Sequence, residues 1–301
     1  MERELGMVDL KRQPKPVGHE MKRISGILEN LPEIAPKKVD AVCMLTRGSA
    51  HWPSAAPCYI LAKQAGLETT MVSQQQIRRY EDLPEAKVYF VPCVYGWSPL
   101  NKEPYDALIR RAEEGASVCF SVATGQLGEC ERILGLTSHG MQNAGNETMT
   151  FHDGTTLPMQ YAKRYNMEPV TAEVLARDST GNVVFSRNRI GKGWVYYVGF
   201  PLETMLWNRP GVFSCGLDYA KIYREVGAEV LAEHPVRAAN SQIGLTLHEN
   251  AGGWYAVAIN YDGREQDAKL DMNEGWEARS VYGDMTKIEG CGMAMIELIR
   301  K

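Results

Sequence analysis

The stretch Val39-Asp-Ala-Val-Cys-Met-Leu45 decides the fold class, because it is a nearly continuous apolar run. Such a run is typical of a parallel strand that is buried on both faces of its sheet. A helical segment from Ala55 to Ala65 follows and ends at Gly66. The alternation then continues with strands at 68–72, 87–91 and 116–122, and with a helix that starts at Pro104 and ends at Gly115.

Strands and helices that alternate at this spacing predict an α/β fold with a doubly wound, mostly parallel sheet. Three short strand-like runs at 172–176, 183–186 and 194–198 are separated by turn signals, so we expect them to be antiparallel and to extend one edge of that sheet. A last helix carries Ile222 to Leu231. From Val236 onward only strand-like runs and glycine-containing turns remain, which predicts a small antiparallel β domain. The expected divisions are 1–35, 36–235 and 236–301.

The first of these divisions is an amphipathic helix with no strand before it. Pro16 is a favourable first helical residue, and Pro32 ends the pattern. The apolar positions recur every three or four residues and include Val17, Met21, Ile24 and Leu28. This stripe either packs on its own domain or docks onto a separate body. We favour docking, because the chain supplies nothing upstream for the helix to cover.

Composition excludes several function classes. The 301 residues are 44% hydrophobic and carry a net charge of −4 with both signs interspersed, so we expect no nucleic acid and no membrane as a partner. No apolar stretch approaches the roughly 20 residues of a membrane helix, and no secretory signal is apparent, which favours a cytoplasmic location. The seven cysteines form no CxxC pair, so we expect buried reduced thiols, no metal and no cofactor.

Two loops are candidates for binding. A doubly wound sheet holds ligands at the carboxyl ends of its strands. The loop after the first strand carries Arg47, His51 and Trp52, and it lacks both GxGxxG and the P-loop pattern. The loop after the third strand carries Tyr95 and Trp97. These side chains either meet a carbohydrate or a neighbouring subunit, or they cover a core edge.

The sequence offers no catalytic machinery of its own. A class I glutamine amidotransferase sheet would carry its nucleophile on a tight turn in a Gly-x-Cys-x-Gly pattern. Here Cys119 lies in the middle of a strand, and no cysteine or serine occupies such a turn. Adjacent carboxylates such as Glu113 and Glu114 point in different directions on a helix, so we interpret them as solvated rather than as an acid/base pair. We predict no catalytic residue.

Taken in order, the segments resemble the rear part of the family 42 glycoside hydrolases, the β-galactosidase type. The resemblance rests on Glu2-Arg-Glu-Leu-Gly-Met-Val-Asp-Leu10 with Pro14-Lys-Pro16, on Phe120-Ser-Val-Ala-Thr-Gly125 with Leu134-Gly135, and on Tyr197-Val-Gly-Phe-Pro-Leu-Glu203. In that family a catalytic (β/α)8 barrel precedes an amidotransferase-like, flavodoxin-like trimerisation domain and a small β domain. The resemblance implies that both catalytic glutamates lie on barrel strands that this sequence lacks.

Our leading hypothesis is a non-catalytic subunit of a split glycoside hydrolase that pairs with a separately encoded (β/α)8 catalytic subunit. The resemblance implies a homo-oligomer with a trimeric core, in which Arg47, His51, Trp52 and Trp97 reach the barrel mouth of a neighbouring subunit. The alternative is a stand-alone carbohydrate-binding or sensor protein on an inactive amidotransferase-like fold. A third hypothesis is an independent hydrolase, which predicts activity from the chain alone.

Overall fold

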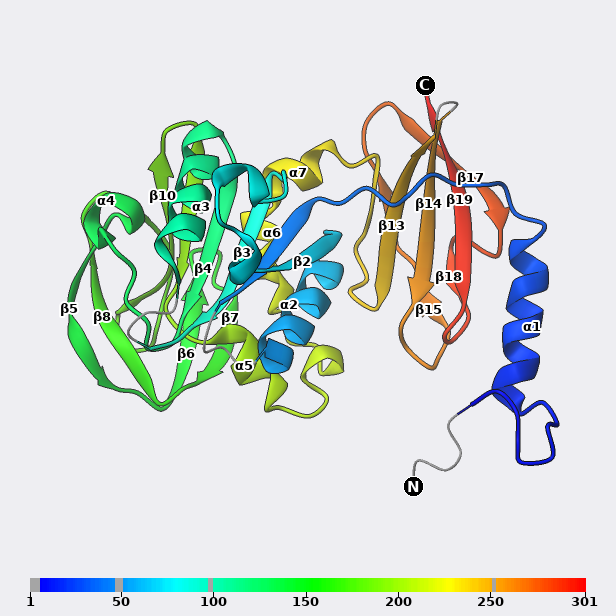
Figure 1. The fold of residues 1–301 in the computed structure, drawn as a ribbon, viewed down its shortest axis with the longest axis horizontal. Coiled ribbons are helices and arrows are strands. Elements are labelled where there is room, and N and C mark those ends of the chain that lie inside the picture. Colours follow the sequence, from blue (N-terminus) through cyan, green and yellow to red (C-terminus); the bar gives the residue numbers. More distant parts are fainter. Residues whose placement is uncertain (1–5, 47–50, 97–99, 251–252) are drawn as a thin grey trace.

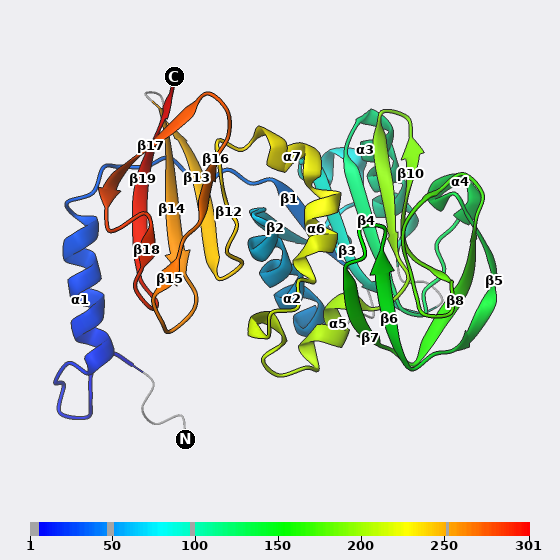
Figure 2. The same cartoon turned by 180° about the vertical axis from the view of Figure 1, so that it is seen from behind.

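A computed structural model describes residues 6–46, 51–96, 100–250 and 253–301. Two sheets dominate it: a nine-stranded sheet flanked by helices and a smaller four-stranded sheet that lies beside it (Figures 1 and 2). The helices of the described residues are α1 Pro16–Leu28, α2 His51–Ala65, α3 Lys102–Glu114, α4 Cys130–Leu134, α5 Leu202–Trp207, α6 Ala220–Val226 and α7 Ala228–Glu233. None of them is long and apolar enough to cross a membrane.

The nine-stranded sheet has the order β2-β1-β3-β4-β11-β10-β9-β6-β7. Its parallel part consists of β2 (Thr69–Ser73), β1 (Ala41–Leu45), β3 (Val88–Val94), β4 (Ser117–Val122) and β11 (Gly193–Val198). All seven residues of β3 and all six of β4 are buried, as expected for central parallel strands. The four predicted parallel strands are therefore confirmed, with ends shifted by at most three residues.

Each face of this sheet has its own hydrophobic core. One core is formed with α2, α5, α6 and α7, where Tyr223 stacks on Phe90 with ring centroids 4.1 Å apart. The other is formed with α3 and α4, and it contains Leu108 and Phe120. The predicted last helix is broken into α6 and α7 at Gly227, where a Cβ atom would come within 2.7 Å of the Leu67 side chain. Helices on both faces make the sheet doubly wound.

The antiparallel extension is larger than the sequence indicates. It contains β10 (Val183–Ile190), β9 (Glu173–Arg177), β6 (Asn146–Phe151) and β7 (Thr156–Gln160), while β5 (Leu136–Asn143) and β8 (Lys163–Pro169) form a separate ribbon. The expectation that the run 194–198 is purely antiparallel is wrong. This strand, β11, pairs antiparallel with β10 but parallel with β4, because the chain returns to the parallel part after its excursion through β5 to β10.

The four-stranded sheet has the order β13-β14-β19-β17, and all its pairs are antiparallel. Its strands are Ile243–Asn250, Gly253–Asn260, Met293–Arg300 and Trp276–Tyr282 in that order, and the short strands β12 (Val236–Ala238), β15 (Gln266–Asp267), β16 (Leu270–Met272) and β18 (Lys287–Ile288) pair beside it. A third hydrophobic core lies here, with Ala256, Ile296 and Leu298 at its centre. The antiparallel strands predicted after residue 236 are confirmed.

The segment between α1 and β1 runs along strand β13 before it enters the nine-stranded sheet. Ala35 N donates to Asn250 Oδ1 at 2.9 Å, and Lys38 N donates to the Leu247 carbonyl at 2.7 Å. Buried Lys63 on α2 pairs with Glu68 at 2.7 Å and donates to the Leu245 carbonyl at 2.9 Å. These contacts attach the four-stranded sheet to the rest of the chain.

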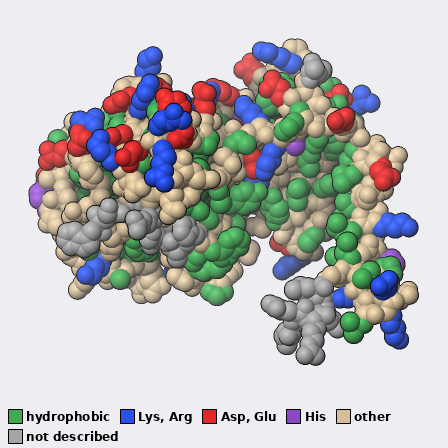
Figure 3. All heavy atoms as spheres, in the orientation of Figure 1, with side chains coloured by type: hydrophobic (Ala, Val, Ile, Leu, Met, Phe, Trp, Pro, Cys, Tyr) green, Lys and Arg blue, Asp and Glu red, His purple; other side chains and the backbone are tan. Residues whose placement is uncertain are grey.

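Helix α1 stands at the outer side of the four-stranded sheet and buries none of its residues in this chain (Figure 1). We call Val17, Met21, Ile24 and Leu28 the α1 stripe. Val17, Met21 and Leu28 are each slightly more than half exposed, and Ile24 is half-buried. Further hydrophobic side chains are visible on the lobe that α1 flanks (Figure 3). The apolar side of α1 therefore remains uncovered, and its docking role stays a prediction.

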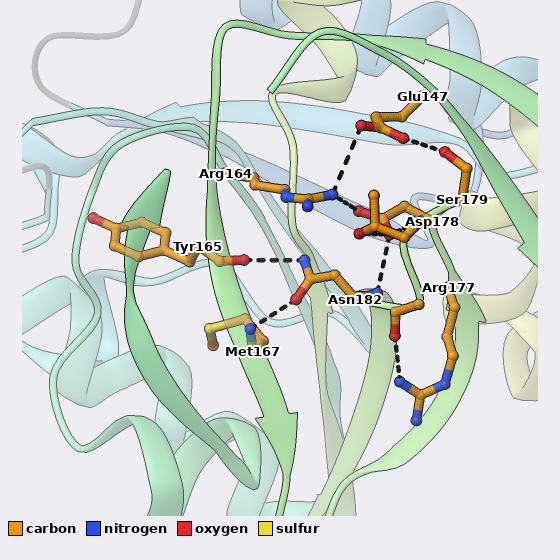
Figure 4. A network of polar contacts seen from close by, with 10 residues as sticks. Glu147, Arg164, Tyr165, Met167, Arg177, Asp178, Ser179 and Asn182 are labelled. Atoms are coloured by element: carbon orange, nitrogen blue, oxygen red, sulfur yellow. Dashed lines mark hydrogen bonds and ion pairs between the residues drawn. The ribbon is translucent and has the colours of Figure 1, made fainter. Parts of the chain in front are cut away.

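A buried ion pair joins β8 to the turn between β9 and β10 (Figure 4). Arg164 pairs with Asp178, and both side chains are almost fully buried, while Glu147 lies 3.9 Å from the same guanidinium. The second oxygen of Asp178 accepts hydrogen bonds from Thr180 N at 2.9 Å and Asn182 N at 3.0 Å. One oxygen of the Asp178 carboxylate thus pairs with Arg164, and the other accepts the hydrogen bonds that form the turn.

Candidate functional site

The carboxyl ends of β1 and β3 define the place where a doubly wound sheet holds ligands. Strand β1 connects to β2 on one side, whereas β3 connects through α3 to β4 on the other, so the connections diverge between these two neighbours. A crevice forms at such a switch point. Here the N-terminus of α2, Tyr95 and the start of α5 follow the strands at this edge.

A buried carboxylate occupies the centre of this edge. Glu203 at the start of α5 accepts hydrogen bonds from Ser121 Oγ at 2.5 Å, from the Tyr223 hydroxyl at 2.8 Å and from Cys93 Sγ at 3.2 Å. Thr204 Oγ1 donates to Cys93 Sγ at 2.9 Å. We call these five residues the Glu203 cluster. It joins β3, β4, α5 and α6, and it satisfies a carboxylate that would otherwise be costly to bury.

Cys93 in this cluster has an unusual backbone. Its φ of +52° places a non-glycine residue in the left-handed region, at a bulge near the carboxyl end of β3. Its backbone N–H donates to Ser121 Oγ at 2.7 Å, which holds this conformation. Such strain near a strand end is characteristic of functional positions. Cys93 lies within β3 and not in a Gly-x-Cys-x-Gly turn, so its conformation is an addition to the sequence analysis: a dihedral angle leaves no mark in the sequence.

The environment of the Cys93 thiol nevertheless disfavours its reactive, deprotonated form. The side chain is fully buried, and burial together with the nearby Glu203 carboxylate raises its pKa well above the usual range. The thiolate, not the thiol, is the nucleophile, so this group is unreactive at neutral pH. No group of three or more His, Cys, Asp or Glu side chains suited to a metal ion occurs in the part of the chain that the structure describes. The Glu203 cluster thus has a structural role: its hydrogen bonds hold the carboxyl ends of β3 and β4 against α5 and α6.

Of the four predicted binding residues, only Trp52 has a described side chain. Trp52 lies in the first turn of α2 and is 68% exposed, so it does not cover a core edge. His51 is the first residue of α2, and its side chain lies outside the described part. Arg47 and Trp97 fall outside the described residues altogether. The structure therefore shows one of the predicted binding residues as an exposed indole at the N-terminus of α2.

Comparison with known proteins yields fold relatives only. No protein-family model matches the sequence, and no curated protein matches it. Among solved structures, the cold-adapted β-galactosidase from Rahnella sp. R3 is similar with a TM-score of 0.68 at 13% identity, over 98% of this chain and 46% of that chain. Gan42B, a GH42 β-galactosidase from G. stearothermophilus, is similar with a TM-score of 0.61 at 14% identity, also over 98% and 46%. The chain shares its fold with part of these enzymes.

The likeness is not confined to β-galactosidases. The α-L-fucosidase isoenzyme 2 from Paenibacillus thiaminolyticus is similar with a TM-score of 0.60 at 10% identity, over 94% of this chain and 51% of that chain. The fold therefore accompanies enzymes named for different sugars, and it does not specify one. The chain spans about half the length or less of each of these relatives.

Proposed function

We propose that this chain is a non-catalytic structural and oligomerisation subunit of a β-galactosidase-like glycoside hydrolase, and that it braces a (β/α)8 barrel on a separately encoded chain. The observation that carries the proposal is the extent of the likeness: it includes 98% of this chain but only 46% of two β-galactosidases. The proposal assigns the catalytic residues to the unmatched part of such an enzyme. Residues 36–235 would oligomerise, and residues 236–301 would support them.

The finer fold assignment belongs to this proposal. We assign the nine-stranded sheet to the amidotransferase-like, flavodoxin-like type and expect a trimeric core. The strand order β2-β1-β3-β4 supports the assignment, since flavodoxin-like sheets run 2-1-3-4-5. The protonated thiol of Cys93 is consistent with a sheet of this type that has no nucleophile of its own.

The uncovered α1 stripe is the proposed contact with the barrel. Three of its four side chains are slightly more than half exposed, and α1 buries none of its residues in this chain. Covering apolar surface is worth about 25 cal/mol per Å². A helix face laid on a larger body is a common recognition mode, in which anchors at i, i+4, i+7 and i+11 share one side. Val17, Met21, Ile24 and Leu28 have this spacing.

The test is affinity purification of the full chain from its native cells, with identification of bound proteins by mass and a nitrophenyl-galactoside assay on the complex. We expect a barrel protein with galactosidase activity to copurify with the wild type. Met21→Asp and Leu28→Asp should release it, whereas His19→Asp, on the opposite side of α1, should not. A chain that stays alone, or a complex that tolerates both stripe variants, would refute the proposal.

The alternative is a stand-alone carbohydrate-binding protein, and the exposure of Trp52 at the carboxyl edge favours it. An exposed indole offers a flat apolar face on which a sugar ring can stack. Calorimetry of the isolated chain with galactose and lactose separates the two functions. Sugar binding that disappears in Trp52→Ala supports the alternative. If neither sugar gives a heat of binding, the alternative is excluded and the assembly function is favoured.

A further inference from the structure

A groove lies between the two main sheets, where helix α2 comes close to strand β13 (Figures 1 and 2). It has two adjoining parts of about 740 and 590 Å³, which share wall residues such as Gln64, Phe213 and Gln242. One wall comes from α2, α6 and the segment 213–218, and the other comes from the segments 238–242 and 261–266. Ligand sites often have this size and lie at such junctions.

Tyr261 gives the groove an exposed aromatic face. This residue directly follows β14, lines the larger part of the groove and is 53% exposed. The hydroxyl end of its ring rests on the backbone of β13, because a Cβ atom built on Gly244 would lie 2.4 Å from the ring atom Cε2. The ring is thus supported on one side and accessible on the other. Such a ring can stack against the apolar face of a ligand.

Two amide side chains from opposite walls meet in the groove. Gln64 on α2 and Gln242 before β13 both donate through Nε2 to the Phe213 carbonyl, at 2.8 Å and 3.0 Å. These hydrogen bonds hold both amides in place, and among the described residues no group donates to either amide oxygen. Neither oxygen is buried, so both are accessible from the groove that their side chains line. Two fixed acceptors are therefore left for a ligand.

The charged groups of the groove balance one another. Among the described residues, the Asp262 carboxylate has no cationic partner, and the Arg264 guanidinium has no carboxylate partner. The other two cations on the walls, Lys63 and Arg224, are already paired with carboxylates. One carboxylate and one guanidinium remain, which gives no excess charge to attract an anion or a cation. The groove therefore favours a neutral ligand.

We propose that this groove binds a neutral oligosaccharide, with one sugar ring stacked on Tyr261 and sugar hydroxyls donating to the amide oxygens of Gln64 and Gln242. A sugar ring has an apolar face of C–H groups and a rim of hydroxyls, which matches an aromatic face beside fixed acceptors. A cavity of roughly 150 Å³ holds one benzene ring. Each part of the groove is several times larger, so linked sugars fit. The site is separate from Trp52 and does not rest on the proposed assembly function.

The test is calorimetric titration of the full chain with four neutral tetrasaccharides: galactotetraose, cellotetraose, mannotetraose and maltotetraose. We expect at least one to bind saturably, and tetragalacturonate, an anionic chain of the same length, to bind more weakly. In Tyr261→Ala the best neutral ligand should bind roughly threefold to tenfold more weakly, because the stacking face is lost. Tyr282→Ala is the matched control, since this half-buried tyrosine lies on β17 at the far edge of the same sheet, and it should not change the affinity.

Gly244→Ala is a second variant, and it leaves every side chain of the groove unchanged. Its added Cβ atom would displace the Tyr261 ring and should weaken binding to a similar extent, while melting temperatures recorded alongside show that both variants are folded. Copurification of a barrel protein should persist in Tyr261→Ala, which separates this site from the proposed function. No binding of any neutral tetrasaccharide, equally tight binding of tetragalacturonate, full affinity in Tyr261→Ala, or loss of binding in Trp52→Ala would each overturn the proposal.

Discussion

The buried pair of Arg164 and Asp178 allows one prediction to be worked out in magnitude. Asp178→Asn removes the negative charge but keeps an oxygen that can accept the backbone hydrogen bonds of the turn from Thr180 and Asn182. Among the described residues, Arg164 would then keep Glu147, 3.9 Å away, as its one carboxylate partner in the interior. The variant therefore isolates the electrostatic contribution of the pair from the conformation of the turn.

Removal of one partner from a buried ion pair costs about 3–5 kcal/mol. Because Glu147 still compensates Arg164 in part, we expect the low end of this range, about 3 kcal/mol of unfolding free energy. For a body of about 200 residues this corresponds to a fall in melting temperature of roughly 6–12 °C. Adding Arg164→Met should restore part of the loss, since no uncompensated charge then remains.

Differential scanning calorimetry measures this fall, and an exposed pair in the same body is the control. Glu129 and Arg132 are each about half exposed, so Glu129→Gln should change the unfolding free energy by less than about 1 kcal/mol. A melting temperature for Asp178→Asn that equals that of Glu129→Gln would refute the reasoning, because it would mean that burial does not strengthen the pair.

Three further predictions follow from burial and close packing. Burial raises the pKa of Tyr196 to about 12, so the folded state keeps this proton while the unfolded chain loses it near pH 10. The free energy of unfolding should therefore decline between pH 10 and 12. Tyr196→Phe should reduce the fall of the melting temperature over this pH range. Gly193→Ala would place a Cβ atom 2.1 Å from a backbone oxygen and should lower the melting temperature strongly, whereas Gly145→Ala, with open space around it, should not. Thiol labelling followed by mass spectrometry should modify exposed Cys215 rapidly and Cys93 only on unfolding; early modification of Cys93 would show that its cluster opens.

The sequence predicts the parallel strands well and the ribbon beside them poorly, for one physical reason. Strands β3 and β4 are buried on both faces, so every residue carries the apolar signal. Strand β5 exposes most of its side chains, and its polar run Thr137-Ser-His139 gives no alternating pattern. Strands without one buried face cannot be recognised from periodicity.

The candidate site was predictable in place but not in content. Parallel topology alone puts Trp52 at the carboxyl edge, and the tryptophan is exposed there. The Glu203 cluster depends on Cys93, 110 residues away in the chain, and on Ser121, 82 residues away. Neither contact has a local signature, and the left-handed backbone of Cys93 is fixed by the same distant partners. Only the folded chain reveals this arrangement.

The path of Glu33 to Lys38 along β13 also sets an order of events during synthesis. The Asn250 amide binds the Glu33 carbonyl across 217 residues of chain, so this anchor cannot form until β13 has left the ribosome. At roughly 5–20 residues per second, about 10–40 s pass between the synthesis of Glu33 and the synthesis of Asn250. Nascent-chain proteolysis should therefore cut near Glu33 until Asn250 has emerged from the ribosome, and the cut should be suppressed from that length onward.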